Sequence, residues 1–244
     1  LAVSDLANYE VDWVEPISVN YRGFDVWEIP PNGHGLVALI ALNLLKGFDF
    51  AERDTVLTYH RQIEAIKLAF ADGLAHIAEP AHMRVSVADL LSSAYADERR
   101  RLIGEQAGLP QPGTPPAGGT VYLSTADAEG NMVSLIQSNY MGFGSGMVVP
   151  GTGIALHNRG HNFYHTIIPG FLTCGGKPLG PFGVMGGFMQ PQGHVQVVMN
   201  TIDFQLNPQA ALDAPRWEWG SGREVHIERS TAEHLFRGLA ARGH

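Results

Sequence analysis

The sequence predicts an α+β fold whose two halves differ in character. Residues 1–119 hold most of the segments with helical periodicity, whereas residues 120–244 begin with runs that alternate like strands. Between them, residues 108–119 (GLPQPGTPPAGG) contain four glycines and four prolines, a composition typical of an exposed connection. We therefore expect a division of the chain at residue 119.

The first half is expected to contain two short strands followed by helices. The strands alternate at 9–13 and 24–29. After Pro30-Pro31, an apolar segment rich in Leu and Ala predicts a helix, and Asp54 is expected to cap the longest one. Apolar spacing places the helices at 36–45, 54–77, 86–91 and 94–103.

The second half is expected to open with a hairpin, 121–126 and 132–138, joined by the turn at 127–131. A helix is expected over 190–206 because its apolar residues share one helical face, although β-branching also allowed a strand there. Asn207 and Ser230 are expected to cap two shorter helices. Further strands are expected at 147–150, 153–156, 166–172 and 182–185.

Composition excludes several functional classes. The chain has 24 acidic and 16 basic residues, a net charge of −8, and no basic run suited to nucleic acid. Its longest apolar run, 35–45, is shorter than the roughly 20 residues of a membrane span. No secretory h-region is visible, so we expect a cytoplasmic protein, with periplasmic or secreted location as the alternative. The sequence leaves the oligomeric state open, a homo-oligomer included.

The stretch 120–200 is unusually poor in charge. Its 81 residues include 15 glycines and four charged side chains, at Asp127, Glu129, Arg159 and Lys177. Such a stretch is expected to form buried strands and tight turns. Its only carboxylates, Asp127 and Glu129, both lie in the turn expected at 127–131.

Thr120 directly follows Gly118-Gly119 and begins a predicted strand. This arrangement suits an N-terminal nucleophile, in which cleavage before the threonine frees an α-amino group to act as base for the hydroxyl. A glycine pair before a strand is also commonly a simple turn. Gly186 and Gly187 precede the predicted helix at 190, where backbone N–H groups can stabilise an oxyanion, although a tight turn needs the same residues.

Two other patterns do not support a cofactor. The loop Gly142–Gly146 resembles a phosphate-binding loop but lacks its lysine and helix. His157 and His161 are four residues apart in a Gly- and Asn-rich turn, where helical ligand spacing does not apply. We therefore expect neither a nucleotide nor a metal.

Taken in order, these segments resemble the γ-glutamyltransferase family of N-terminal-nucleophile hydrolases. The segments that carry the resemblance are Pro30-Pro31, Thr120 with 127–133 (DAEGNMV), 143–149 (FGSGMVV), 153–158 (GIALHN), Gly186-Gly187 and 206–217 (LNPQAALDAPRW). The resemblance implies a four-layer αββα sandwich, of which this chain is a part. It also implies two subunits cut from one precursor: 1–119 ends the large subunit, and 120–244 is the small catalytic subunit.

The resemblance further implies roles for single residues. Thr120 is the expected nucleophile, with its own α-amino group as base, and Gly186 and Gly187 form the expected oxyanion hole. Ser138 lies where the family keeps a hydroxyl that orients the nucleophile.

The residues that match the family's amino-acid clamp differ from its pattern. Asn162 replaces a carboxylate that grips the substrate amine, and His165-Thr166 replaces a pair of serines. Tyr140 replaces an asparagine, with Asn139 one residue away, and Arg159 adds a cation that favours an acid. We take these residues as the candidate substrate-binding set.

These departures resemble the branch that includes oxamate amidohydrolase. The expected substrate is a small carboxylate-bearing amide, cleaved through an acyl-enzyme on Thr120. One alternative is a γ-glutamyltransferase or γ-glutamyl hydrolase acting on glutathione-like substrates. Another is an uncleaved, non-catalytic family member that serves as a binding protein.

Overall fold

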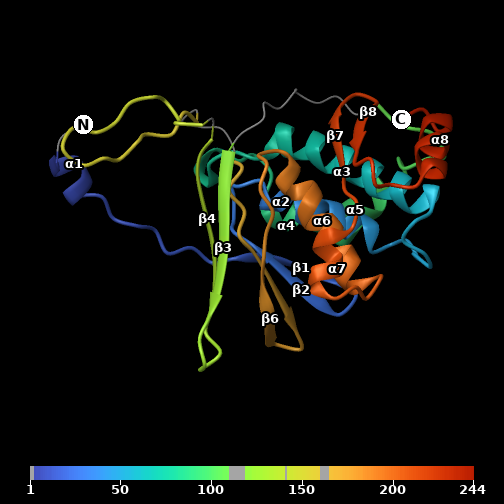
Figure 1. The fold of residues 1–244 in the computed structure, drawn as a ribbon, viewed down its shortest axis with the longest axis horizontal. Helices are drawn as coiled ribbons and strands as arrows, with labels where there is room; N and C mark the ends of the chain where they lie inside the picture. Colours follow the sequence, from blue (N-terminus) through green and yellow to red (C-terminus); the bar gives the residue numbers. More distant parts are fainter. Residues whose placement is uncertain (1–2, 110–118, 141, 160–164) are drawn as a thin grey trace.

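The computed structural model describes residues 3–109, 119–140, 142–159 and 165–244 (Figure 1). The elements of the first half are α1 (Val3–Ala7), β1 (Ile17–Tyr21), β2 (Phe24–Glu28), α2 (Gly35–Leu45), α3 (Val56–His76), the 3-10 helix η1 (Pro80–His82), α4 (Val87–Leu90) and α5 (Ser93–Arg100). Those of the second half are β3 (Gly119–Ala126), β4 (Met132–Tyr140), β5 (Gly170–Cys174), β6 (Lys177–Phe182), α6 (Met189–Ile202), α7 (Pro208–Asp213), β7 (Trp217–Ser221), β8 (Glu224–Ile227) and α8 (Glu233–Ala241).

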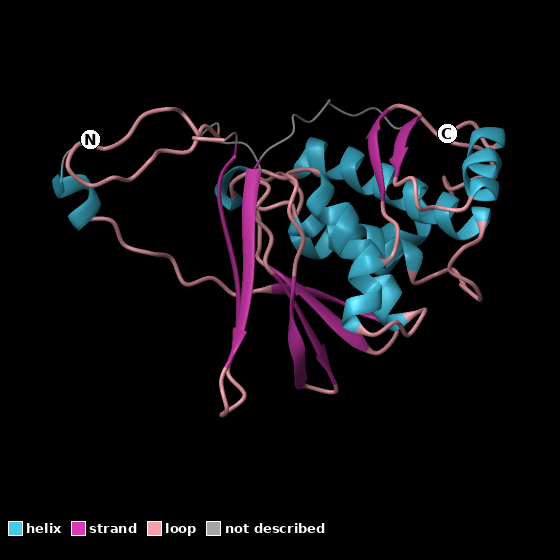
Figure 2. Cartoon of the chain, viewed as in Figure 1, coloured by secondary structure: helices cyan, strands magenta, loops and turns pink. Residues whose placement is uncertain are grey.

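Strands from both halves form one antiparallel sheet in the order β1-β2-β5-β6. β2 joins the halves, because it pairs with β1 on one side and with β5 on the other. The long β3–β4 hairpin forms a separate two-stranded sheet and lies beside β6. Apart from α1, which lies beyond the β3–β4 hairpin, the helices gather on one side of this hairpin (Figure 2). Buried residues of both halves form one hydrophobic core.

Helix α2 is at the centre of this core. All eleven of its residues are buried, and it contacts α3, α5, α6 and β1. A helix that is apolar around its whole circumference is stable only when other elements cover every face. The expectation of a helix at 36–45 is therefore confirmed.

Two glutamines of α6 hold β7 in place. The Gln192 side chain accepts a hydrogen bond from Trp219 N at 2.7 Å and donates one to Trp219 O at 3.1 Å. Gln196 does the same for Trp217, at 3.1 and 2.8 Å. Each carboxamide thus makes the two backbone hydrogen bonds that a neighbouring strand would make to one residue of β7. This explains why the two glutamines lie on a buried face of the helix.

Several predicted boundaries are wrong at the N-terminal end. Residues 9–13 form no strand, and Tyr9, Val11 and Trp13 are 74%, 69% and 96% exposed, because no described strand lies beside them. The first strand is β1, further along the chain. The cap of α3 is Thr55 rather than Asp54, since the Thr55 hydroxyl accepts from Thr58 N at 3.1 Å.

Other corrections fall in the second half. The strands expected at 147–150 and 153–156 are reduced to one bridge, Val148 to Ala155, in a glycine-rich loop. The strands expected at 166–172 and 182–185 lie instead at β5 and β6, which pair with each other. The turn between them contains Gly175 and Gly176, both with positive φ. Ser230 does not cap α8, whose N-cap is Ala232. The hairpin, α6, and the Asn207 cap of α7 are confirmed.

Candidate active site

Thr120 lies at an irregularity in the β3–β4 hairpin. Gly119 pairs with Tyr140 and Val121 pairs with Gln137, so Thr120 alone faces the two residues Ser138 and Asn139. Such a bulge bends a strand and re-aims its side chain. The candidate nucleophile and the hydroxyl expected to orient it therefore lie on neighbouring strands at the same level of the hairpin.

The first turn of α6 lies against Thr120. Gln190 Nε2 is 3.5 Å from Thr120 Oγ1, and the Gln190 side chain is fully buried. Gly186 and Gly187, just before this helix, have φ of 119° and 59°, values that favour glycine. The glycine pair thus leads into a helix whose N-terminal end faces the threonine, which is a favourable place for developing negative charge.

Arg159 ties the candidate substrate-binding residues together. Its Nη1 donates to Ser138 O at 2.8 Å, and its Nη2 donates to Ser138 Oγ at 3.0 Å and to Thr166 Oγ1 at 3.2 Å. The guanidinium carbon is 5.2 Å from the centre of the Tyr140 ring. Tyr140 has φ of 75°, and its N–H donates to Ser138 Oγ at 2.9 Å, so the strand end is bent toward the arginine.

Among the described residues, the Arg159 guanidinium has no counter-ion. It is half-buried, and no carboxylate in the described ranges pairs with it. Its Nε is buried without a hydrogen-bond partner, and burial lowers the pKa of the group. A half-buried cation without a counter-ion is stabilised by an anion that reaches it.

His165 is held beside this cluster by backbone pairing. His165 N donates to Asn32 O at 2.8 Å, and His165 O accepts from His34 N at 3.0 Å, just before α2. Burial and the Arg159 charge lower the pKa of His165 to about 4, so its ring is neutral at pH 7. Its Nδ1 accepts from Ile167 N at 3.2 Å, which assigns the proton to Nε2.

Most of the predicted site residues are therefore close together. Ser138, Tyr140, Arg159 and Thr166 form one hydrogen-bonded cluster beside Thr120, and Gly186-Gly187 lead into the helix that contacts Thr120. Asn139 is used by its backbone, whose carbonyl accepts from Asn158 N at 3.3 Å. Asn162 lies outside the described residues.

Sequence reasoning missed Gln190 and a buried histidine–glutamate contact one helical turn further along α6. His194 Nδ1 is 2.6 Å from Glu28 Oε1, and both side chains are fully buried. Burial raises the pKa of Glu28, and the His194 charge opposes that rise. Neither Glu28 Oε2 nor His194 Nε2 has a hydrogen-bond partner within the described ranges. These residues come from β2 and α6, which are 166 positions apart, so no local spacing could have joined them.

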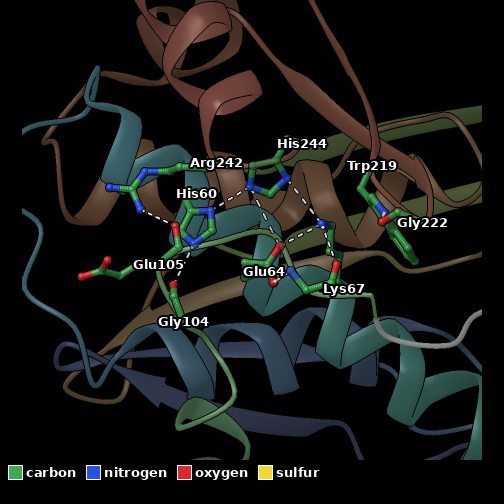
Figure 3. A network of polar contacts seen from close by, with 10 residues as sticks. His60, Glu64, Lys67, Gly104, Glu105, Trp219, Gly222, Arg242 and His244 are labelled. Atoms are coloured by element: carbon green, nitrogen blue, oxygen red, sulfur yellow. Dashed lines mark hydrogen bonds and ion pairs between the residues drawn. The ribbon is translucent and has the colours of Figure 1, made fainter.

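A second polar network lies away from this site, between α3 and the chain end (Figure 3). Ligand atoms of His60, Glu64 and His244 lie within 4.8 Å of one another. However, Lys67 Nζ donates to Glu64 Oε1 at 2.8 Å and lies 3.4 Å from His244 Nδ1. His60 lies between His244 Nε2, at 2.7 Å, and Gly104 O, at 2.9 Å. The ammonium already neutralises the carboxylate, so these groups are better explained as a hydrogen-bonded network than as a metal site.

No helix in the described ranges combines the length and apolar character needed to span a bilayer.

Comparison with known proteins decides the family. Residues 1–244 match the family model described as Gamma-glutamyltranspeptidase. The chain belongs to this family. Its sequence is 35% identical to the glutathione hydrolase-like YwrD proenzyme of Bacillus subtilis, over 100% of this chain and 51% of that protein. It is 34% identical to the acylase ACY 1 proenzyme of a Pseudomonas strain (99% and 47%), and 30% identical to the oxamate amidohydrolase proenzyme of Klebsiella pneumoniae (100% and 50%).

A solved structure supports the same relationship. The crystal structure of cephalosporin acylase from Bacillus halodurans superposes with a TM-score of 0.93 and 63% identity, over 100% of this chain and 48% of that one. The family resemblance and the α+β fold class of an N-terminal-nucleophile hydrolase are thus confirmed. The chain spans about half the length of the relatives it matches. This agrees with the expectation that it is a part of the family's fold.

Proposed function

We propose that this chain is the catalytic part of an amidohydrolase proenzyme that cleaves itself between Gly119 and Thr120. Residues 1–119 would then end the large subunit, and 120–244 would form the small one. The proposal is supported by relatives that are named as proenzymes and by the position of Thr120 at a bulge facing Ser138. Since strands of both halves share one sheet, the pieces would stay associated after cleavage.

In the proposed reaction the freed α-amino group of Thr120 takes the hydroxyl proton, and Oγ1 bonds to the substrate carbonyl carbon. The oxyanion forms near Gly186-Gly187, at the N-terminal end of α6. The C–N bond then breaks and the leaving amine takes the proton. Water hydrolyses the resulting ester, which releases a carboxylic acid and restores Thr120.

One observation supports the substrate class: Arg159 donates hydrogen bonds to Ser138, and no carboxylate among the described residues neutralises its guanidinium. A carboxylate on the acyl part of the substrate would supply the missing counter-ion close to the reacting carbonyl. We therefore propose a small carboxylate-bearing amide, of the oxamate kind. A second candidate is a γ-glutamyl amide, favoured by relatives named as glutathione hydrolases. Both substrates carry a carboxylate, but only the second also needs a partner for an α-amino group.

A substrate panel tests the assignment on the full-length protein. Oxamate, an N-acyl amide without a carboxylate and a γ-glutamyl anilide would be assayed with wild type, Arg159→Met and Arg237→Met. Arg237 is an exposed arginine paired with Glu233, so it controls for loss of charge. We expect Arg159→Met to lower kcat/KM about 10- to 100-fold for carboxylate-bearing amides, the loss of one charge-assisted hydrogen bond, and much less for the neutral amide.

Turnover of the γ-glutamyl anilide alone would refute the oxamate-like assignment and favour the second candidate. Equal losses on charged and neutral amides would refute the role of Arg159. A folded wild-type protein that remains one uncut polypeptide and turns over no amide would instead favour a non-catalytic member of the family.

A further inference from the structure

The Gln190 carboxamide is only half-satisfied. Its Nε2 lies 3.5 Å from Thr120 Oγ1, whereas its Oε1 is buried and has no hydrogen-bond partner in the part of the chain that the structure describes. The side chain has no exposed surface, so solvent does not reach this oxygen. A buried acceptor left unpaired is unfavourable and rare in native proteins, and a role in catalysis is one explanation for it.

The other two glutamines of α6 show what such an amide can do. Gln192 and Gln196 each use both ends of the carboxamide to grip the N–H and the C=O of one tryptophan on β7. Gln190 differs because only its donor end has a partner, and that partner is the hydroxyl of the candidate nucleophile. A donor on the same residue would complete the equivalent two-point contact.

We propose that Gln190 is a catalytic residue that holds both reactive groups of Thr120, with Nε2–H donating to Oγ1 and Oε1 accepting from the freed α-amino group. This rests on the proposed self-cleavage, which converts the Thr120 peptide N–H into an amine with additional N–H donors. The amine then lies beside the hydroxyl whose proton it accepts. The Nε2–H bond stabilises negative charge on Oγ1 as that proton leaves.

The proposal has a consequence for pH dependence that a merely structural role lacks. An acceptor on the amine favours its protonated form and therefore raises the amine pKa. Replacing Gln190 with Met removes the acceptor, and replacing it with Glu strengthens it, so the two changes should shift the amine in opposite directions. The other titratable groups on the elements around Thr120 are unaltered in these variants: Tyr122, Tyr140, Arg159, His165 and the Glu28–His194 pair.

The experiment compares Gln190→Met, Gln190→Glu and Gln196→Met in the full-length protein. Self-cleavage is followed by intact mass, and kcat/KM against pH is measured on the best substrate of the panel. We expect Gln190→Met to lower kcat about 10- to 100-fold, the loss of one or two hydrogen bonds to reacting groups. The acid limb of the kcat/KM profile reports the pKa of the Thr120 amine. It should move to lower pH in Gln190→Met and to higher pH in Gln190→Glu.

Gln196→Met serves as the matched control, because it removes a buried amide from the same helix without touching Thr120. It should lower the unfolding temperature and leave the acid limb in place. A folded Gln190→Met protein that stays uncut while Gln196→Met is cleaved would support the Nε2–Oγ1 part of the proposal, because that contact is present before cleavage. Acid limbs of both Gln190 variants that coincide with wild type would overturn it. Thr120→Ala tests the proposed function separately from the role of Gln190. If Thr120→Ala were still cleaved or active, the proposed function would fail whatever the Gln190 variants show.

Discussion

Replacing Lys67 with methionine should destabilise the protein by about 3–5 kcal/mol. Lys67 and Glu64 form an ion pair of 2.8 Å, with side chains 0% and 3% exposed. The change keeps an unbranched side chain of similar length but leaves the Glu64 carboxylate without its cation. Breaking a buried pair by removing one partner typically costs about this much, because the remaining charge stays out of water.

The same network predicts how the loss can be recovered. Glu64 Oε2 accepts from Gly108 N at 2.9 Å, and a glutamine at 64 could keep this bond without a charge. Lys67→Met combined with Glu64→Gln should therefore be more stable than Lys67→Met alone. A surface control is Arg237→Met, whose ion pair with Glu233 is 80% and 77% exposed and should contribute under about 1 kcal/mol.

Thermal and denaturant unfolding of the four proteins would provide the measurement. For a chain of this size, each kcal/mol of lost stability lowers the thermal unfolding midpoint by about 2–4 °C. Lys67→Met should therefore lower this midpoint by roughly 6–20 °C. A Lys67→Met protein within about 1 kcal/mol of wild type would refute the reasoning. So would a double variant no more stable than the single one, because the unpaired carboxylate would then not be the cause.

The remaining predictions concern acid stability and the glycine pair. Burial, with neighbouring cations, lowers the pKa of His165 to about 4 and that of His244 to about 3, and so the unfolded chain binds protons below pH 6.5 that the folded chain does not. Stability should fall as the pH drops from about 6.5 toward 4, by at most about 1.4 kcal/mol per pH unit for each group; unfolding midpoints that stay level between pH 7 and 5 would contradict this. Gly186 has φ of 119°, and a Cβ there would lie 3.1 Å from Met189 Cβ, so Gly186→Ala should displace the backbone N–H from the oxyanion and lower kcat by up to about 10²–10³. Gly146→Ala, also at positive φ but with no atom near its Cβ, should retain kcat. Equal kcat values for the two variants would count against the proposed oxyanion hole.

The sequence was most informative where local pattern and tertiary environment agree. Helix α2 is apolar on every face and buried on every face, and the turn at 127–131 closes a regular hairpin. The segment 9–13 alternates like a strand but has no described neighbour to pair with. Conversely, β7 was missed because its pairing comes partly from the side chains of Gln192 and Gln196.

The site residues likewise divide into those that the sequence could indicate and those that depend on contacts distant in sequence. Thr120 could be proposed from its place after Gly118-Gly119 and from the family resemblance, and Ser138 from the resemblance alone; the hairpin brings the two residues to the same level. Gln190 and the Glu28–His194 pair could not be proposed, because a buried polar residue on an apolar helix has no spacing signal, and its partner is distant in sequence. Arg159 was noticed through the scarcity of charge around it, and its contacts with Ser138 and Thr166 required the fold.

The central claim is that Thr120 becomes a new N-terminus. Intact mass and N-terminal sequencing of the purified full-length protein test it most directly. The account predicts two polypeptides, the downstream one beginning at Thr120, and a single uncut polypeptide for Thr120→Ala. A wild-type protein that is active while remaining one chain, or whose downstream piece begins at another residue, would contradict it.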